Sequence, residues 1–390
     1  MSNTTGVAPA RSASQSHPVL RVARILALVY LFLLGIHVLG EGFTLLGQGL
    51  LDSFFKATEN PFFALMVGIF ATSIVQSSSL TTSLIVGLVG APDNPLPLAN
   101  AIPMVMGANF GTTVTNTVVA LAHIGRKDEF ERAFAVSTCD DFFNFFAVCL
   151  LLPVEIATGI LAKSASSLAD FFTAGAGLDY ESPVKTALEV GYAAPAALAE
   201  TVFSSARAQG FLLALVACGL IFFALISLVK TMRRSVEARV EGFIVKAFEQ
   251  SAFVAIGMGL VATVMVQSSS ITTSLLVPLA GAGLLTLDRA FPVVLGANVG
   301  TTVTAMMAAV AATGPNARAG IAIALVHFLF NFSGILLLFP IPAIRRIPLS
   351  ASRRLAQVGI RSAPLAIGYV IALFYGVPAI FAAINHLYFR

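Results

Sequence analysis

The chain has 390 residues, of which 57% are hydrophobic and only 11% are charged, and its mean hydropathy is +0.89. A soluble domain carries about a quarter charged residues and cannot bury this much apolar sequence, so the composition excludes a soluble fold and indicates a membrane protein. The net charge of +4 lies in short basic runs between apolar stretches, which is typical of the flanks of membrane spans and not of a nucleic-acid-binding face.

The chain begins with a segment rich in Ser, Thr and Ala, and we expect residues 1–24 to be a disordered cytoplasmic tail. The apolar run 25–39 predicts the first span, and no signal-peptide cleavage site follows it. Further apolar windows lie at 60–92, 94–125, 133–154, 208–229, 250–287, 290–317, 319–344 and 362–389.

Two windows, 60–92 and 250–287, are too long for one span of about 20 residues and carry Ser and Thr in the middle. We expect both to be re-entrant hairpins. Basic clusters predict which segments face the cytoplasm, and the acidic stretch 153–210 predicts an extracytoplasmic linker. The predicted division is a first transmembrane repeat at 25–152, the linker at 153–210, a second repeat at 211–342, and a cytoplasmic loop with a C-terminal span at 343–390.

An internal repeat connects the two halves. QSSSLTTSL at 76–84 recurs as QSSSITTSL at 267–275, GANFGTTVT at 107–115 recurs as GANVGTTVT at 296–304, and FNF at 143–145 recurs at 330–332. Three predicted spans separate the hairpins, and this odd number predicts two inverted repeats. Inverted repeats with broken helices are typical of secondary transporters, so the expected fold class is an all-α polytopic membrane protein with a hairpin in each repeat.

The polar runs inside apolar windows are candidates for a ligand site. An unpartnered polar group costs several kcal/mol in hydrocarbon, so such a run must line a cavity or pack against protein. Hydroxyl and amide groups suit both a hydrated anion and a hard monovalent cation. Helix–helix packing alone is the simpler reading for one Ser-Ser-Ser run, and the matched duplication argues against it.

Two acids, Asp140 and Asp141, lie in the apolar window 133–154. They are either functional intramembrane carboxylates or interfacial residues paired with Arg132, and the sequence leaves both readings open. His327 aligns with Asp140 in the repeat and is interpreted as a packed core imidazole.

With these motifs the chain resembles the type II sodium–phosphate cotransporters over about residues 25–342. The resemblance rests on the paired QSSS runs and on four stretches: MGANFGTTVTNTVVA, FERAFAVSTCDDFFN, LLLPVE and HFLFNFSGILL. It implies a symporter that imports inorganic phosphate with sodium as co-transported ligand, and neither an enzyme nor a resident cofactor. The family commonly has His where this chain has Asp140, which bears on sodium stoichiometry and pH response. The external segment lacks Cys and Asn-x-Ser/Thr, which favours a bacterial inner membrane.

The candidate residues follow from the motifs together with the resemblance. The candidate substrate-binding residues are Gln76, Ser77, Ser78, Ser79, Asn109, Gln267, Ser268, Ser269, Ser270 and Asn298. The candidate sodium ligands are Gln76, Thr112, Thr113, Asp141, Asn144, Gln267, Thr301, Thr302 and Asn331. The partners are phosphate, sodium and the lipid bilayer, with no nucleic acid and with a homo-oligomer left open.

Three other functions compete with this one. A sodium-coupled carrier of another oxyanion or carboxylate would use the same chemistry. An intramembrane serine hydrolase would need one Ser placed against one base, whereas the chain has two equivalent triple-Ser runs. A permease subunit of an ATP-driven importer would need a partner ATPase, because the chain contains no Walker A loop.

Overall fold

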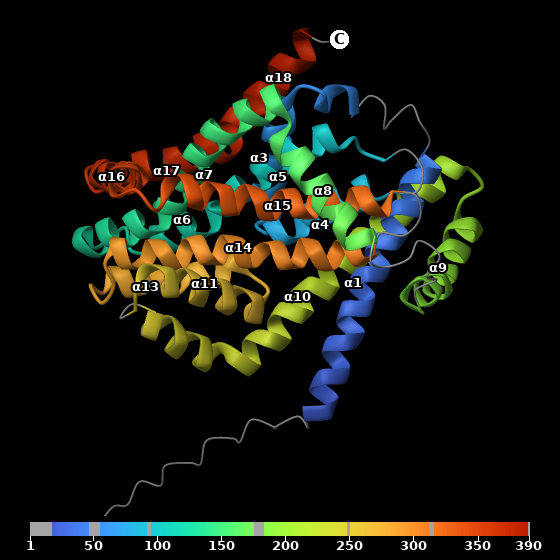
Figure 1. Ribbon diagram of the computed structural model, residues 1–390, viewed down its shortest axis with the longest axis horizontal. Helices are drawn as coiled ribbons and strands as arrows, with labels where there is room; N and C mark the ends of the chain where they lie inside the picture. The colour runs from blue at the N-terminus through green and yellow to red at the C-terminus, as the bar shows by residue number, and fades with distance from the viewer. Residues whose placement is uncertain are drawn as a thin grey trace, which may run out of the picture.

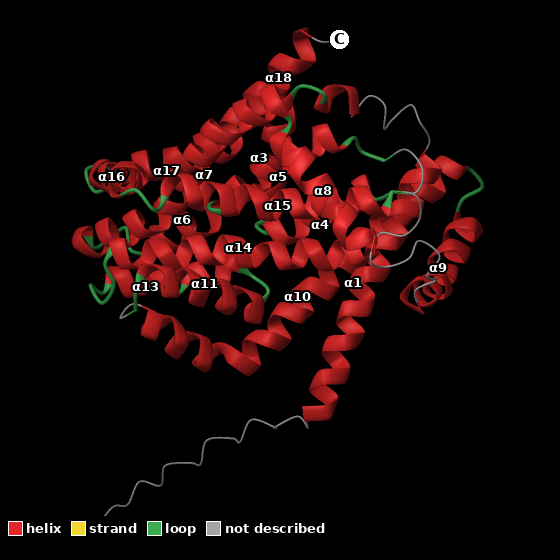
Figure 2. Cartoon of the chain, viewed as in Figure 1, coloured by secondary structure: helices red, strands yellow, loops and turns green. Residues whose placement is uncertain are grey.

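The structure is a computed structural model that describes residues 18–46, 55–91, 95–174, 183–247, 250–311 and 316–388. Figure 2 shows helices joined by short loops, with no strand among the described residues. The elements are α1 (Pro18–Leu46), α3 (Pro61–Val75), α4 (Ser78–Val89), α5 (Leu98–Thr112), α6 (Val114–Leu121), α7 (Lys127–Thr158), α8 (Ile160–Ala174), α9 (Pro183–Val202), α10 (Ala206–Ala247), α11 (Ala252–Val266), α12 (Ser269–Ser274), α13 (Leu276–Gly281), α14 (Leu287–Ala311), α15 (Ala317–Leu338), α16 (Pro342–Gly359), α17 (Ala363–Ile371), the π-helical turn η1 (Ala372–Gly376) and α18 (Val377–Tyr388).

Six of the described helices are long and apolar enough to cross a bilayer, or seven spans if one bent helix pair is included. These six are Val22–Leu46, Lys127–Thr158, Ala206–Thr231, Leu287–Val310, Ala317–Leu338 and Ala363–Ile384. The prediction of an all-α polytopic membrane protein is therefore confirmed. The window 94–125 differs from the expected single span, because it forms two helices, α5 and α6, that meet at Thr113.

One expected segment boundary changes. Residues 1–17 lie outside the described part of the chain, and α1 begins at Pro18, so 18–24 is helical rather than disordered. The cause is that Val19, Leu20 and Val22 extend the apolar pattern, and a proline is tolerated in the first turn. The predicted linker 153–210 is largely helical, because α7 continues to Thr158 and α8, α9 and the start of α10 follow.

Both expected hairpins are broken at the predicted polar runs. The first runs from α3 to α4, and the second runs from α11 into α12 and α13 with a bend of 120°. In each half the entering helix packs against the helix of the GAN motif: α3 packs on α5, and α11 packs on α14 (Figure 1). The returning helices cross to the other half, because α4 contacts α14 and α12 contacts α6.

The glycines of the GAN motifs permit this packing in the same way in both halves. A Cβ atom at Gly107 would collide with the carbonyl oxygen of Leu65, and a Cβ atom at Gly296 would collide with that of Ile256. Both glycines are inside regular helices, so they serve close backbone approach rather than unwinding. The repeat seen in the sequence is thus a repeat of tertiary contacts.

Candidate functional site

Each hairpin breaks at a glutamine followed by a serine. Gln76 ends α3 with φ 55° and ψ 30°, and Gln267 ends α11 with φ 56° and ψ 30°. They are the two non-glycine residues with positive φ in the described part of the chain. Because this left-handed conformation is costly for a residue with a side chain, its recurrence at two matched positions indicates a functional constraint.

The serine after each glutamine caps the returning helix. Ser77 Oγ accepts a hydrogen bond from the Leu80 amide at 3.3 Å, and Ser268 Oγ accepts one from the Ile271 amide at 3.4 Å. The next serines in each run make no side-chain hydrogen bond to the described residues, although most of them are buried. These are Ser78, Ser79, Ser269 and Ser270. These serines begin the returning helices directly after the breaks, where the repeated motif predicts them.

A buried polar cluster connects the first repeat to the second through Asp140. Asp140 Oδ1 accepts hydrogen bonds from Asn298 Nδ2 at 2.7 Å and from Asn144 Nδ2 at 2.8 Å. Asp140 and Asn144 are on α7, whereas Asn298 belongs to the GAN motif on α14. The asparagine of the second GAN motif is therefore held by the first half.

The reciprocal cluster contains His327. Asn109 Oδ1, from the GAN motif on α5, lies 3.1 Å from His327 Nε2 and accepts a hydrogen bond from Asn331 Nδ2 at 3.1 Å. His327 and Asn331 are on α15, at the positions that match Asp140 and Asn144 in the other half. Each half thus holds the asparagine of the other half, and such reciprocal contacts are expected of two parts related by a two-fold axis.

Asp141 lies beside the first cluster and is only partly satisfied. Its Oδ2 accepts a hydrogen bond from the Tyr369 hydroxyl at 2.8 Å, and its Oδ1 is buried without a hydrogen-bond partner. The side-chain oxygens of Asn144 and Asn331 are likewise buried and unpartnered. Buried polar atoms are normally hydrogen-bonded, so three such oxygens on the predicted sodium ligands call for an explanation.

Arg132 does not pair with either acid, so the predicted alternative in which Arg132 pairs with Asp140 and Asp141 is wrong. Its guanidinium donates to the carbonyl oxygens of Ala280 and Gly281 at 2.6–3.1 Å. A basic side chain is favoured at such a helix C-terminus, because the last carbonyls have no partner within the helix.

The four threonines among the predicted sodium ligands are buried, and their hydroxyls donate to carbonyls of the preceding turn of helix. The bonds are Thr112 to Ala108, Thr113 to Phe110, Thr301 to Ala297 and Thr302 to Val299, at 2.7–3.1 Å. Their oxygens keep lone pairs for a cation, and the side chain of Thr113 also interacts with the carboxyl group of Asp141.

The two hairpin glutamines have different surroundings. Gln267 is buried; its Nε2 donates to the Val264 carbonyl at 2.8 Å, and its Oε1 accepts from Thr304 Oγ1 at 3.1 Å. The side chain of Gln76 is exposed and makes no hydrogen bond to the described residues. The sequence predicted equal roles for the two amides, and the surroundings of these side chains are not equal.

Sequence reasoning gave no role to Asn116, Tyr369 or Tyr375. Asn116 Oδ1 on α6 accepts hydrogen bonds from Thr273 Oγ1 at 2.9 Å and Ser274 Oγ at 3.1 Å, which ties the second hairpin to the first half. Its matched residue is Ala305, so a comparison of the two repeats position by position would have singled Asn116 out.

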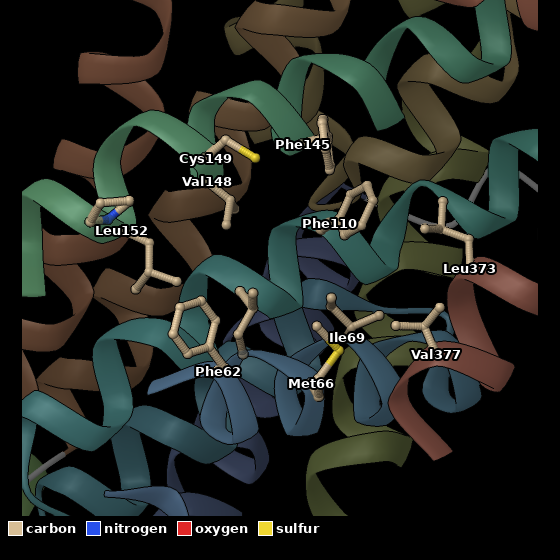
Figure 3. A pocket seen from close by; sticks show the side chains of 12 residues that line it. Phe62, Met66, Ile69, Phe110, Phe145, Val148, Cys149, Leu152, Leu373 and Val377 are labelled. Carbon is tan, nitrogen blue, oxygen red and sulfur yellow. The ribbon is translucent and has the colours of Figure 1, made fainter. Parts of the chain in front are cut away.

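A separate pocket of about 350 Å³ lies between α3, α5, α7 and the C-terminal helix (Figure 3). Phe62, Met66, Phe110, Cys149 and Val377 line its apolar wall. Such a wall has no donors for an anion, and none of the hairpin serines lines this pocket.

Fold and site together define a multi-pass membrane protein whose two hairpin-bearing halves meet at buried polar clusters. The family described as Na+/Pi-cotransporter matches residues 31–174 and 220–347, and the chain belongs to this family. No solved structure gives a match.

Curated relatives agree with this assignment. The human sodium-dependent phosphate transport protein 2B is 31% identical in an alignment of 445 positions, gaps included, that covers 92% of this chain and 64% of the human protein. The rat sodium-dependent phosphate transport protein 2A is 33% identical in an alignment of 435 positions, gaps included, that covers 94% of this chain and 68% of the rat protein. The chain thus spans about two thirds of the length of these relatives.

Proposed function

We propose that the protein is a symporter that imports inorganic phosphate together with sodium. The observation that carries the proposal is the set of buried, unpartnered oxygens of Asp141, Asn144 and Asn331 within a member of the Na+/Pi-cotransporter family. Carboxylate and carbonyl oxygens are the ligands that hard cations prefer. A sodium ion would give these oxygens the partner that they lack.

The proposed sodium ligands are Asp141, Asn144 and Asn331, with the hydroxyl oxygens of the four threonines and the amide oxygens of Gln76 and Gln267 as further candidates. Asp141 supplies the negative charge among them. A buried carboxylate without a compensating charge is unfavourable, so cation binding stabilises this arrangement.

Phosphate is proposed to bind the serines of the two hairpin breaks, Ser77–79 and Ser268–270. Asn109 and Asn298 are proposed as further phosphate ligands, and their contacts with His327 and Asp140 join the two halves. The runs contain no Lys or Arg, so bound sodium is proposed to supply positive charge for the anion. Sodium and phosphate should then raise each other's affinity by the same factor.

The proposed membrane arrangement places the repeats 25–152 and 211–342 in inverted orientation in a bacterial inner membrane, with the serine runs meeting near the midplane. The segment 153–210 is proposed to lie outside, and the cytoplasmic loop at the start of 343–390 inside. The exchanged contacts of Asn109 and Asn298 support a two-fold relation between the halves. Cysteine accessibility at positions on each side of the membrane would test the orientation.

The function is tested by phosphate uptake into proteoliposomes that contain the purified protein. We expect uptake with an inward sodium gradient and none when potassium or choline replaces sodium. Sulfate and a small carboxylate at constant sodium form the specificity arms. Equal uptake without sodium would refute the coupling, and faster uptake of another anion would reassign the substrate.

A further inference from the structure

The C-terminal helical segment, α17–η1–α18, touches the proposed site through two tyrosine hydroxyls. Tyr369 donates to Asp141 Oδ2 at 2.8 Å, and Tyr375 donates to the main-chain carbonyl of Ser73 in the first hairpin at 3.0 Å. Tyr375 lies in the π-helical turn η1, a distortion that is frequent at functional sites. The segment lies outside the residues that the family model matches.

The carbonyl that Tyr375 contacts has an exact counterpart in the second hairpin. Ser73 stands three residues before Gln76, and Val264 stands three residues before Gln267. In the second hairpin the Val264 carbonyl accepts a hydrogen bond from Gln267 Nε2 at 2.8 Å. The hydroxyl of Tyr375 therefore takes, in the first hairpin, the place that the glutamine amide takes in the second.

The two glutamine side chains accordingly differ in position. The amide of Gln267 is folded back onto its own helix and is buried. Gln76 has the same backbone conformation, yet its side chain is exposed and makes no hydrogen bond to the described residues. In the first hairpin the hydroxyl of Tyr375, and not the amide of Gln76, bonds to the carbonyl three residues before the glutamine.

We propose that the C-terminal segment is a strap that positions the ligand groups of the first half. Tyr375 keeps the amide of Gln76 available to the transported ions, and Tyr369 holds one oxygen of Asp141 so that the other faces the sodium site. Both tyrosines are positioning residues. The proposal rests on the proposed function, since it assigns the strap to the same sodium and phosphate site.

The first test is sodium-dependent phosphate uptake by Tyr375→Phe and Tyr369→Phe. Each loses one hydroxyl hydrogen bond, so we expect Tyr375→Phe to raise the KM for both sodium and phosphate about fivefold with Vmax unchanged. Tyr369→Phe should raise the sodium KM by a similar factor. The matched control is Tyr30→Phe, which removes a hydroxyl bond of 2.9 Å to the Ala187 carbonyl between α1 and α9.

The second test separates positioning from a general effect on folding. Phosphate binding at saturating sodium is measured in detergent for Tyr375→Phe, Gln76→Ala and the double variant. If the hydroxyl acts through the amide, the double variant binds as Gln76→Ala does, because the target of the strap is gone. Additive losses, or a Tyr375→Phe protein that transports like Tyr30→Phe, would overturn the strap. A wild-type protein without sodium-dependent uptake would instead overturn the proposed function.

Discussion

The two hairpins share one backbone and differ in what surrounds it. The breaks at Gln76 and Gln267 agree in φ and ψ to within a degree, and the serine caps are the same. Around them, however, the first half has two acids on α7, where the matched positions on α15 are His327 and Phe328. The repeated residues thus build the geometry, and the residues that are not repeated give each half its chemistry.

The difference in charge suggests a division of labour between the halves. Asp141 is the buried acid with an unpartnered oxygen, and it lies in the first half together with the exposed Gln76. In the second half, Thr304 donates a hydrogen bond to the side chain of Gln267, and Thr273 donates one to Asn116 on α6. The simplest interpretation of this asymmetry is that the first half binds the ligand, whereas side-chain hydrogen bonds stabilise the second half.

The largest effect is expected from replacing Asp141, the acid for which the second half has no counterpart. Asp141→Asn should lower the apparent sodium affinity roughly 10- to 100-fold, because hydrogen bonds and ion contacts of charged groups are worth about 1.5–3 kcal/mol. The matched control is Phe328→Leu, which should change sodium affinity less than about twofold. Uptake at graded sodium concentrations measures both, and equal effects in the two halves would contradict the division of labour.

The glycines test the part of the comparison in which the halves agree. Gly107→Ala and Gly296→Ala should each lower the free energy of unfolding by about 1–3 kcal/mol, because both added methyl groups collide with a main-chain carbonyl. Gly257→Ala on α11 is the control, since a Cβ there meets no atom within 4 Å. Thermal unfolding in detergent is the measurement, and tolerance of only one of the two collisions would show that the packing is not duplicated.

The two hairpin glutamines test whether a side-chain amide serves ligand binding alone or also stabilises the protein. Gln76→Ala should lower uptake about tenfold without changing thermal stability, because its amide makes no hydrogen bond to the described residues. Gln267→Ala should lower uptake and also cost about 1 kcal/mol of stability, since it leaves Thr304 and the Val264 carbonyl without their partner. Equal stability of the two variants would remove the proposed difference between the hairpins.

The sequence predicts the six long apolar helices and the two breaks, because apolar windows and a repeated motif are local signals, but it does not predict the division of 94–125 into α5 and α6. It also singles out Asp141, Asn144 and Asn331 as candidate ligands. It does not predict the strap, since Tyr369 lies 228 residues from Asp141 and Tyr375 lies 302 residues from Ser73. Such pairings depend on how the C-terminal helix packs. Nor does the sequence predict that the amide of Gln267 folds back onto its own helix, because the two nearly identical motifs give no reason to expect different surroundings.

The smallest expected effect concerns Asn116, which braces the second hairpin from the first half and has only Ala305 as its counterpart. Asn116→Ala removes the acceptor shared by Thr273 and Ser274, at a cost of about 1 kcal/mol. Local opening of 269–281 should then be about fivefold more frequent, while 78–89 stays unchanged. Hydrogen exchange resolved by peptide compares the two segments within one protein, so 78–89 is an internal control. Equal acceleration in both hairpins would mean that Asn116 stabilises the whole interface between the halves, and the brace would then not be particular to the second hairpin.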